Sequence, residues 1–252
     1  KGNVIYIDDM ASVFGMDAVR YFVLHEMPYE NDGVISWELM VERYNSDLAN
    51  TLGNLVSRTV AMSNKYFGGI VEDSGVKEAV DEDLKRVASE CCALVCAKMD
   101  ELRVADALTE IFNLFKRCNK YIDETEPWKL AKDEGAKDRL AAVLYNLVEG
   151  IRIGASLLEP YMPQTSAKIL SQIGADAGSF DSLSEFGAYV SGGKVEENPE
   201  MLFARKDLNE VLKQTEEIVA KQKKEYYESQ VIASKNLREA GKIQEAERIE
   251  EN

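Results

Sequence analysis

The sequence contains a single histidine, and its only cysteines are Cys91, Cys92, Cys96 and Cys118. No two of these cysteines form a CxxC pair, whereas a structural zinc site needs four suitably spaced soft ligands, so we expect no metal site. Nothing else indicates an oxidising compartment, and we expect free thiols buried on helix faces rather than disulfides. His25 has no nearby partner for acid–base chemistry, which favours a structural histidine and leaves no catalytic residue to assign.

The sequence also lacks long apolar runs and a surplus of positive charge. No run approaches the roughly 20 apolar residues that cross a bilayer, and no signal-peptide pattern opens the chain, which predicts a cytoplasmic protein without a membrane partner. Lys and Arg number 30 against 45 Asp and Glu, for a net charge of -15. Because a domain that binds nucleic acid through its overall field is usually basic, we expect no DNA binding, and any RNA contact must be local.

Apolar residues recur at three- and four-residue steps through residues 36–67, which predicts one long helix with a buried stripe. The stripe consists of Val41, Tyr44, Leu48, Leu52, Leu55 and Met62. Ser36 is a suitable N-cap, and two glycines at 68 and 69 supply a stop signal. Asn54 and Arg58 lie away from the stripe and four residues apart, so their side chains point from the same face of the helix.

Helical periodicity continues through much of the chain, after a short β-rich run at residues 1–7. It predicts helices over residues 17–26, 81–102, 104–124, 137–158 and 160–173, with Pro127 ending the third of these. No period-2 segments alternate with the helices, and 252 residues are enough for a substantial core. The sequence therefore predicts an all-α fold, an antiparallel helical bundle.

The composition of the chain shifts at Gly174. Residues 175–206 are rich in Gly, Ser, Asp and Glu and predict a loop region, with a short hairpin as an open alternative. Residues 207–252 predict a charged helix or linker whose apolar edge fades beyond Tyr227. A coiled-coil role for this tail stays open, although Gly241 and the lapsed heptad count against it. We therefore expect four segments: 1–33, 34–174, 175–206 and 207–252.

Three side chains are not explained by packing alone: Asn54, Arg58 and Trp128. A Trp directly after a helix-ending Pro is often a packing plug, and an isolated Arg is most often solvated or ion-paired. Taken together, however, an indole that stacks on a base and an amide and guanidinium that bond base edges are the groups that read splayed RNA bases. Further candidates for local phosphate contacts are Lys65, Asn113, Lys116, Arg117 and Lys120.

Four segments of the chain carry a family resemblance. They are KGNV at residues 1–4, DAVRYFVLHEMPYENDGVIS at 17–36, NSDLANTLGNLVSRT at 45–59 and NKYIDETEPWKLAK at 119–132. In order and spacing they resemble the C-terminal part of bacterial methionyl-tRNA synthetases, which are class I enzymes, and the resemblance covers roughly residues 1 to 210. A start on KGNV without Met predicts a piece of a longer protein.

The resemblance implies that residues 1–33 are a stem-contact segment at the end of a catalytic half, followed by an anticodon-binding helical bundle at 34–174. The family's KMSKS and HIGH signatures are absent from this sequence and would lie upstream, so the chain is expected to be inactive alone and to hold no cofactor. ATP with Mg²⁺ is implied for the full-length enzyme, which activates methionine and esterifies it to its tRNA. The implied partners are methionine tRNAs and the missing catalytic half.

By the same resemblance, the family's anticodon-reading Asn and Arg fall on Asn54 and Arg58, and its stacking Trp falls on Trp128. The implied function is recognition of the CAU anticodon. Two alternatives stay open: a sister class I synthetase for valine, leucine, isoleucine or cysteine, which shares the helical bundle, and a helical protein-interaction scaffold with no RNA role. Whether a small OB-fold tRNA-binding module follows the tail also stays open.

Overall fold

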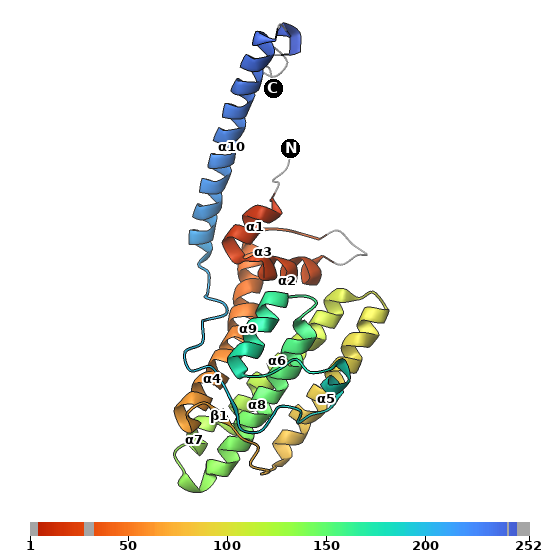
Figure 1. Cartoon of the computed structure of the whole chain (residues 1–252), viewed down its shortest axis with the longest axis vertical. Helices are drawn as coiled ribbons and strands as arrows, with labels where there is room; N and C mark the ends of the chain where they lie inside the picture. Colours follow the sequence, from red (N-terminus) through yellow and green to blue (C-terminus); the bar gives the residue numbers. More distant parts are fainter. Residues whose placement is uncertain (1–4, 28–32, 241, 246–252) are drawn as a thin grey trace.

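The computed structural model describes residues 5–27, 33–240 and 242–245, and almost all of its regular structure is helical (Figure 1). The first elements are α1 (Ile7–Phe14), α2 (Met16–Glu26), α3 (Trp37–Arg43), a π-helical stretch (Tyr44–Gly53), α4 (Asn54–Phe67) and β1 (Ile70–Val71). The next are α5 (Ala79–Asp100), α6 (Val104–Thr125), α7 (Pro127–Leu130), a 3-10 turn (Glu134–Ala136) and α8 (Lys137–Leu158). The last are α9 (Pro163–Ile173), a 3-10 turn (Phe180–Ser184), β2 (Gly193–Lys194) and α10 (Leu208–Glu239). The all-α prediction is confirmed.

The helices α5, α6, α8 and α9 run up and down as neighbours, and α8 lies at their centre because all four of α4, α5, α6 and α9 pack against it (Figure 1). From residue 139 onward almost every side chain of α8 is buried, as expected for a helix that is apolar all round. The segment 134–158 is long and apolar enough to cross a membrane, but 89% of its apolar window is buried inside the protein. Its apolar character is therefore explained by its place in the core.

Two glycines on α8 let α6 approach closely. A Cβ built on Gly154 would collide with the ring of Phe115, and one built on Gly150 would lie 2.8 Å from Sγ of Cys118. Both neighbouring side chains belong to α6 and are fully buried. The close packing of α6 on α8 therefore requires glycine, which has no side chain, at these two positions.

The predicted helix over residues 36–67 is continuous but not uniform. Ser36 is its N-cap and accepts from the backbone N–H of Leu39 at 3.1 Å, and Gly68 ends it in the left-handed conformation with φ of 60°. Between α3 and α4, however, the backbone adopts π-helical geometry over ten residues. A π-helical insertion shifts the register of the helix downstream of it, and the 3.6-residue pattern could not reveal it because the buried stripe passes through it unbroken.

Two local predictions are wrong. Ile7, expected to belong to a β-rich run, opens α1, an amphipathic helix whose buried side includes Met10, Val13 and Phe14. Residues 1–4 lie outside the described residues. The alternative of a hairpin within residues 175–206 also fails, because β2 pairs in antiparallel fashion with β1, with Ile70 opposite Lys194. Such a pairing between segments more than a hundred residues apart leaves no local turn signal in the sequence.

The segment between α9 and α10 is fastened to α8 by a buried carboxylate. Glu149 is fully buried and accepts hydrogen bonds from the backbone N–H groups of Gly187 and Ala188 at 2.9 Å and of Tyr189 at 3.1 Å. The guanidinium of Arg152 also donates to this carboxylate, at 2.7 and 2.9 Å. This anchor holds a segment without regular structure in place, and no pattern in the sequence indicated it.

The charged helix predicted from residue 207 is present as α10. Its N-cap, Asp207, accepts from the N–H groups of Asn209 and Glu210, and its first half packs on α1 and α3. A hydrogen bond of 2.8 Å from Gln222 Nε2 to Asp9 Oδ1 marks the far end of this contact. Beyond it, α10 projects away from the bundle (Figure 1).

Candidate nucleic-acid interface

The outer face of α4 presents the predicted amide and guanidinium. Asn54 is the first residue of α4 and is exposed, and Arg58 comes one turn later with a third of its side chain, 35%, exposed. Their neighbours Leu55 and Val56 are fully buried on the other side. The π-helical insertion before α4 and the apolar packing of α4 together place both polar side chains at the surface.

Trp128 comes to the same surface from α7. Pro127, at the first position of this four-residue helix, is buried, whereas the indole of Trp128 is 38% exposed. The guanidinium carbon of Arg58 lies 6.0 Å from the centroid of the indole ring, at the limit of a cation–π contact. The structure thus brings together Arg58 and Trp128, which are 70 positions apart in the chain, with Asn54 one turn from Arg58.

The edge of α6 borders these residues. Asn119 Nδ2 donates to the backbone carbonyl of Thr51 at 2.9 Å, and Asp123 Oδ1 lies 4.0 Å from Arg58 Nη2. The candidate phosphate contacts that are exposed on this helix are Asn113, Lys116 and Lys120. Lys120 pairs loosely with Glu124 at 3.5 Å, which leaves its ammonium in solvent. Lys65, near the end of α4, is also exposed and lies 5.3 Å from the ring of Tyr66.

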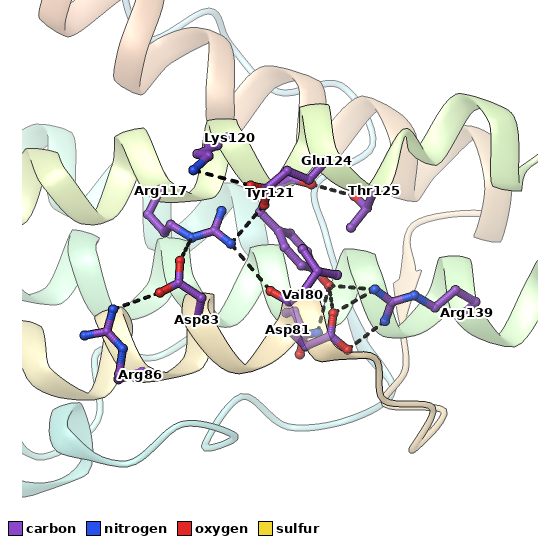
Figure 2. A network of polar contacts seen from close by, with 11 residues as sticks. Val80, Asp81, Asp83, Arg86, Arg117, Lys120, Tyr121, Glu124, Thr125 and Arg139 are labelled. Atoms are coloured by element: carbon purple, nitrogen blue, oxygen red, sulfur yellow. Dashed lines mark hydrogen bonds and ion pairs between the residues drawn. The ribbon is translucent and has the colours of Figure 1, made fainter.

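Arg117 differs from the other candidates because it is turned into the bundle. Its side chain is only 9% exposed, and its Nε donates to Asp83 Oδ2 at 2.6 Å (Figure 2). Nη2 pairs with Glu124 at 2.9 Å, and the guanidinium lies over the ring of Tyr121. The contact with Asp83 ties α6 to α5, and these partners occupy the guanidinium, so we leave Arg117 out of the proposed RNA contacts.

A second polar network lies beneath the α6–α8 connection and was not expected from the sequence. Arg139 donates to both carboxylate oxygens of Asp81 at 2.7 Å, and the hydroxyl of Tyr121 donates to Asp81 Oδ1 at 2.6 Å (Figure 2). Burial alone raises the pKa of Asp81, but the hydrogen bonds from Arg139 and Tyr121 outweigh it and lower that pKa below its ordinary value. Burial also raises the pKa of Tyr121, so its hydroxyl stays a donor.

The sequence did carry one signal for this network. Asp81 occupies the third position of α5 and its carboxylate accepts from the backbone N–H of Glu78, the N-cap, at 2.9 Å, which is half of a capping box. A capping residue normally lies at the surface. Its burial under Arg139 is a tertiary feature that a local pattern does not report.

The cysteines and the histidine occupy structural positions. Cys91, Cys92 and Cys118 are buried free thiols and Cys96 is half-buried, as predicted for helix faces. Burial raises the pKa of Cys91 and that of Cys118 to about 12, which keeps both thiols protonated and unreactive. His25 Nδ1 lies 2.7 Å from Glu26 Oε1, and its ring stacks on Tyr21.

Two family models match this chain. Residues 1–60 match the model described as tRNA synthetases class I (M), and residues 71–223 match the anticodon binding domain of methionyl tRNA ligase. The helical bundle and the two matches define the class to which this part belongs: the class I tRNA synthetases that carry a helical anticodon-binding domain.

Similar proteins and a similar solved structure indicate which family within this class the chain belongs to. The chain is 44% identical to the methionine–tRNA ligase of Clostridium perfringens, over 86% of this chain and 33% of that protein. It is also 44% identical to the ligase of Caldanaerobacter subterraneus, over 99% of this chain and 40% of that protein. The structure of the Mycobacterium tuberculosis methionyl-tRNA synthetase in complex with methionyl-adenylate is similar with a TM-score of 0.76 and 34% identity, over 81% of this chain and 40% of that one.

The chain belongs to the methionyl-tRNA ligase family, and residues 71–223 correspond to the family's anticodon-binding domain. It spans between a third and two fifths of the length of the curated relatives just described.

Proposed function

We propose that this chain recognises the CAU anticodon of methionine tRNAs, as the anticodon-binding part of a longer methionine–tRNA ligase. One observation carries the proposal: Arg58 lies 6.0 Å from an indole that is 38% exposed, on the surface of a chain that belongs to this family. The exposed face of Trp128 is free to stack on an unpaired base, and base–aromatic stacking accounts for much of the recognition of single-stranded RNA.

The neighbouring side chains would supply sequence discrimination. The guanidinium of Arg58 offers several N–H donors and the amide of Asn54 offers both donors and an acceptor, so together they can bond the edges of unstacked bases. The contact with Trp128 and the 4.0 Å approach of Asp123 restrict the rotamers of Arg58, which reduces the entropy lost on binding.

In this proposal the catalytic steps belong to another part of the ligase, where methionine is activated by ATP and esterified to the tRNA. ATP and Mg²⁺ belong, in this proposal, to that catalytic part. We further propose that the protein acts in the cytoplasm, where charged tRNA is used, together with its catalytic half.

Titration of the chain with anticodon stem-loop RNAs tests the proposal. We expect saturable binding of the CAU loop, and we expect Trp128→Ala to weaken it roughly ten- to a hundredfold because about 1–3 kcal/mol of stacking is lost. Trp37→Phe is the matched control, because Trp37 stacks on Phe14 within the fold at 6.3 Å. An affinity that Trp128→Ala leaves unchanged would refute the reading role of Trp128.

The same titration separates the rival functions. A loop with the valine anticodon CAC or an isoleucine anticodon GAU should bind more weakly than CAU; equal or tighter binding would favour a sister synthetase. If no anticodon loop binds in a saturable, salt-sensitive way, the helical scaffold without an RNA role becomes the better account.

The proposed backbone contacts need a separate measurement. If Lys120 neutralises one phosphate, Lys120→Ala should reduce the slope of log affinity against log salt by about 0.7, the value for one contact with a single strand. Lys224→Ala is the control, because Lys224 is equally exposed on α10 and also pairs with a Glu four residues later, at 3.9 Å. Lys65 and Lys116 can be examined in the same way, and an unchanged slope removes a residue from the set. Asn113 is uncharged, so it is tested instead by the affinity of Asn113→Ala at a fixed salt concentration.

A further inference from the structure

The helix that carries Trp128, α7, is too short to be stable without contacts to the rest of the fold. α7 has only four residues and joins the end of α6 to the beginning of α8. The residue before it, Glu126, has φ of 43° and ψ of 60°, a left-handed conformation that is strained for a residue with a Cβ. Strained backbone persists only where the surrounding structure imposes it.

A buried hydrogen-bond network joins the two helices on either side of α7, α6 and α8. The hydroxyl of Tyr121 donates to Asp81 and accepts from Asn146 Nδ2 at 3.1 Å and from Arg139 Nη2 at 3.5 Å. Tyr121 lies near the end of α6 and Arg139 in the first turn of α8. The hydrogen bond between them therefore joins the two ends of the chain segment that contains α7. Figure 2 shows the side chains of both residues pointing toward Asp81.

The network also reaches the last turn of α6 directly. Thr125 Oγ1 donates to the backbone carbonyl of Tyr121 at 2.7 Å, and the N–H of Glu126 donates to the carbonyl of Ile122 at 3.0 Å. A shift of Tyr121 would thus be transmitted to the residue that sets the direction of α7. Because packed helices change arrangement in discrete steps, small shifts at their base are not absorbed locally.

We propose that Tyr121, held by Asp81 and Arg139, is a positioning residue for Trp128 and so sets the affinity of the anticodon surface without touching RNA. The inference rests on the proposed function, since it concerns the orientation of the indole that would stack on the anticodon. Loss of the Tyr121 hydroxyl leaves the ring and the packing of α6 on α8 in place but removes the hydrogen bonds that join Tyr121 to Arg139 and Asn146 of α8.

The experiment uses the whole 252-residue chain with Trp37→Phe, so that Trp128 is the only indole. In this background we expect Tyr121→Phe to increase acrylamide quenching of Trp128 fluorescence and to weaken CAU stem-loop binding about three- to tenfold, within the coupling range of residues in one network. The matched control is Tyr145→Phe, which also removes a buried hydroxyl, one that donates to the carbonyl of Tyr189 at 2.9 Å. This control should change neither signal.

A double-mutant cycle decides whether Tyr121 acts through Trp128. If it does, Tyr121→Phe has no further effect on RNA affinity once Trp128 is Ala. An equal loss in both backgrounds, or an unchanged quenching of the indole, would overturn the proposal. Arg139→Lys provides a second variant, which keeps the positive charge beside Asp81 but loses the bidentate hydrogen bonds to its carboxylate. It should also increase acrylamide quenching of Trp128.

Failure of this inference is distinguishable from failure of the proposed function. If Trp128→Ala alone leaves RNA affinity unchanged, the anticodon-reading role is lost, whereas the response of the indole to Tyr121→Phe still supports or overturns the positioning role. Far-UV circular dichroism of each variant confirms that the helices are retained before either comparison is made.

Discussion

Among substitutions that change the volume of a side chain as little, we expect Glu149→Gln to destabilise the folded chain most. Gln has nearly the same shape, so packing is conserved and the loss of charge is isolated. In the native structure the carboxylate of Glu149 accepts hydrogen bonds from three backbone N–H groups and from Arg152. Both side chains are shielded from water, with 0% of Glu149 and 3% of Arg152 exposed. The amide has one acceptor oxygen, and its own N–H₂ group must face other donors.

The expected loss in free energy of unfolding follows from the geometry of this buried ion pair. Removal of one partner of a buried ion pair costs about 3–5 kcal/mol, because the remaining charge stays buried without compensation. Arg152 would lose its negatively charged partner and keep its contact of 3.2 Å with the carbonyl of Ala177. Since domains are stable by about 5–15 kcal/mol, we expect the variant to lose roughly a fifth or more of its free energy of unfolding.

Urea unfolding monitored by circular dichroism measures the loss, and hydrogen exchange locates it. The amides of Gly187, Ala188 and Tyr189 should lose their protection in Glu149→Gln while those in the middle of α8 keep theirs. Asp123→Asn is the control, because its pair with Arg58 is 4.0 Å long with the carboxylate 71% exposed, and such pairs contribute at most about 1 kcal/mol. A loss below about 1 kcal/mol in Glu149→Gln, with the three amides still protected, would refute the reasoning.

Two further variants test the core. Because hydrogen bonds from Arg139 and Tyr121 hold the pKa of Asp81 below its ordinary value of 3.8, its contribution to stability is present at pH 7 and is lost as the pH falls through the lowered pKa. Urea midpoints should therefore show Asp81→Asn less stable than wild type at pH 7 but less sensitive to acidification below about pH 4. Gly154→Ala should lower the free energy of unfolding by about 1–3 kcal/mol through its clash with Phe115; a gain, as helix propensity alone predicts, would contradict the close packing of α6 on α8.

The helices of the bundle were predictable because each buries a stripe that the sequence displays. In α6 the buried positions Leu108, Ile111, Phe115 and Ile122 recur at helical steps, so the pattern reports both the helix and its inner face. The π-helical insertion and α7 were not predictable in the same way. Over a few residues the spacing of apolar side chains does not distinguish helices of slightly different pitch.

The candidate site was predictable only in part. The periodicity of residues 36–67 placed Asn54 and Arg58 on the outer face, and both are accessible in the structure. Lys116 and Arg117 looked equivalent in the sequence, yet one is exposed and the other is buried on Asp83 and Glu124. A long basic side chain at the border of an apolar stripe takes the direction in which it finds partners, and one of those partners, Asp83, comes from another helix.

Periodicity and motifs along the chain were sufficient to establish the helical class, the positions of most helices and the family, because these depend on residues that are close in sequence. Three contacts came only from the packed fold: Trp128 lies beside Arg58, Asp81 binds Arg139 in the first turn of α8, and Glu149 holds a distant loop. Each of these contacts joins residues that are tens of positions apart. They arise from the order in which helices pack and from buried charges that must find partners, and a one-dimensional pattern contains neither.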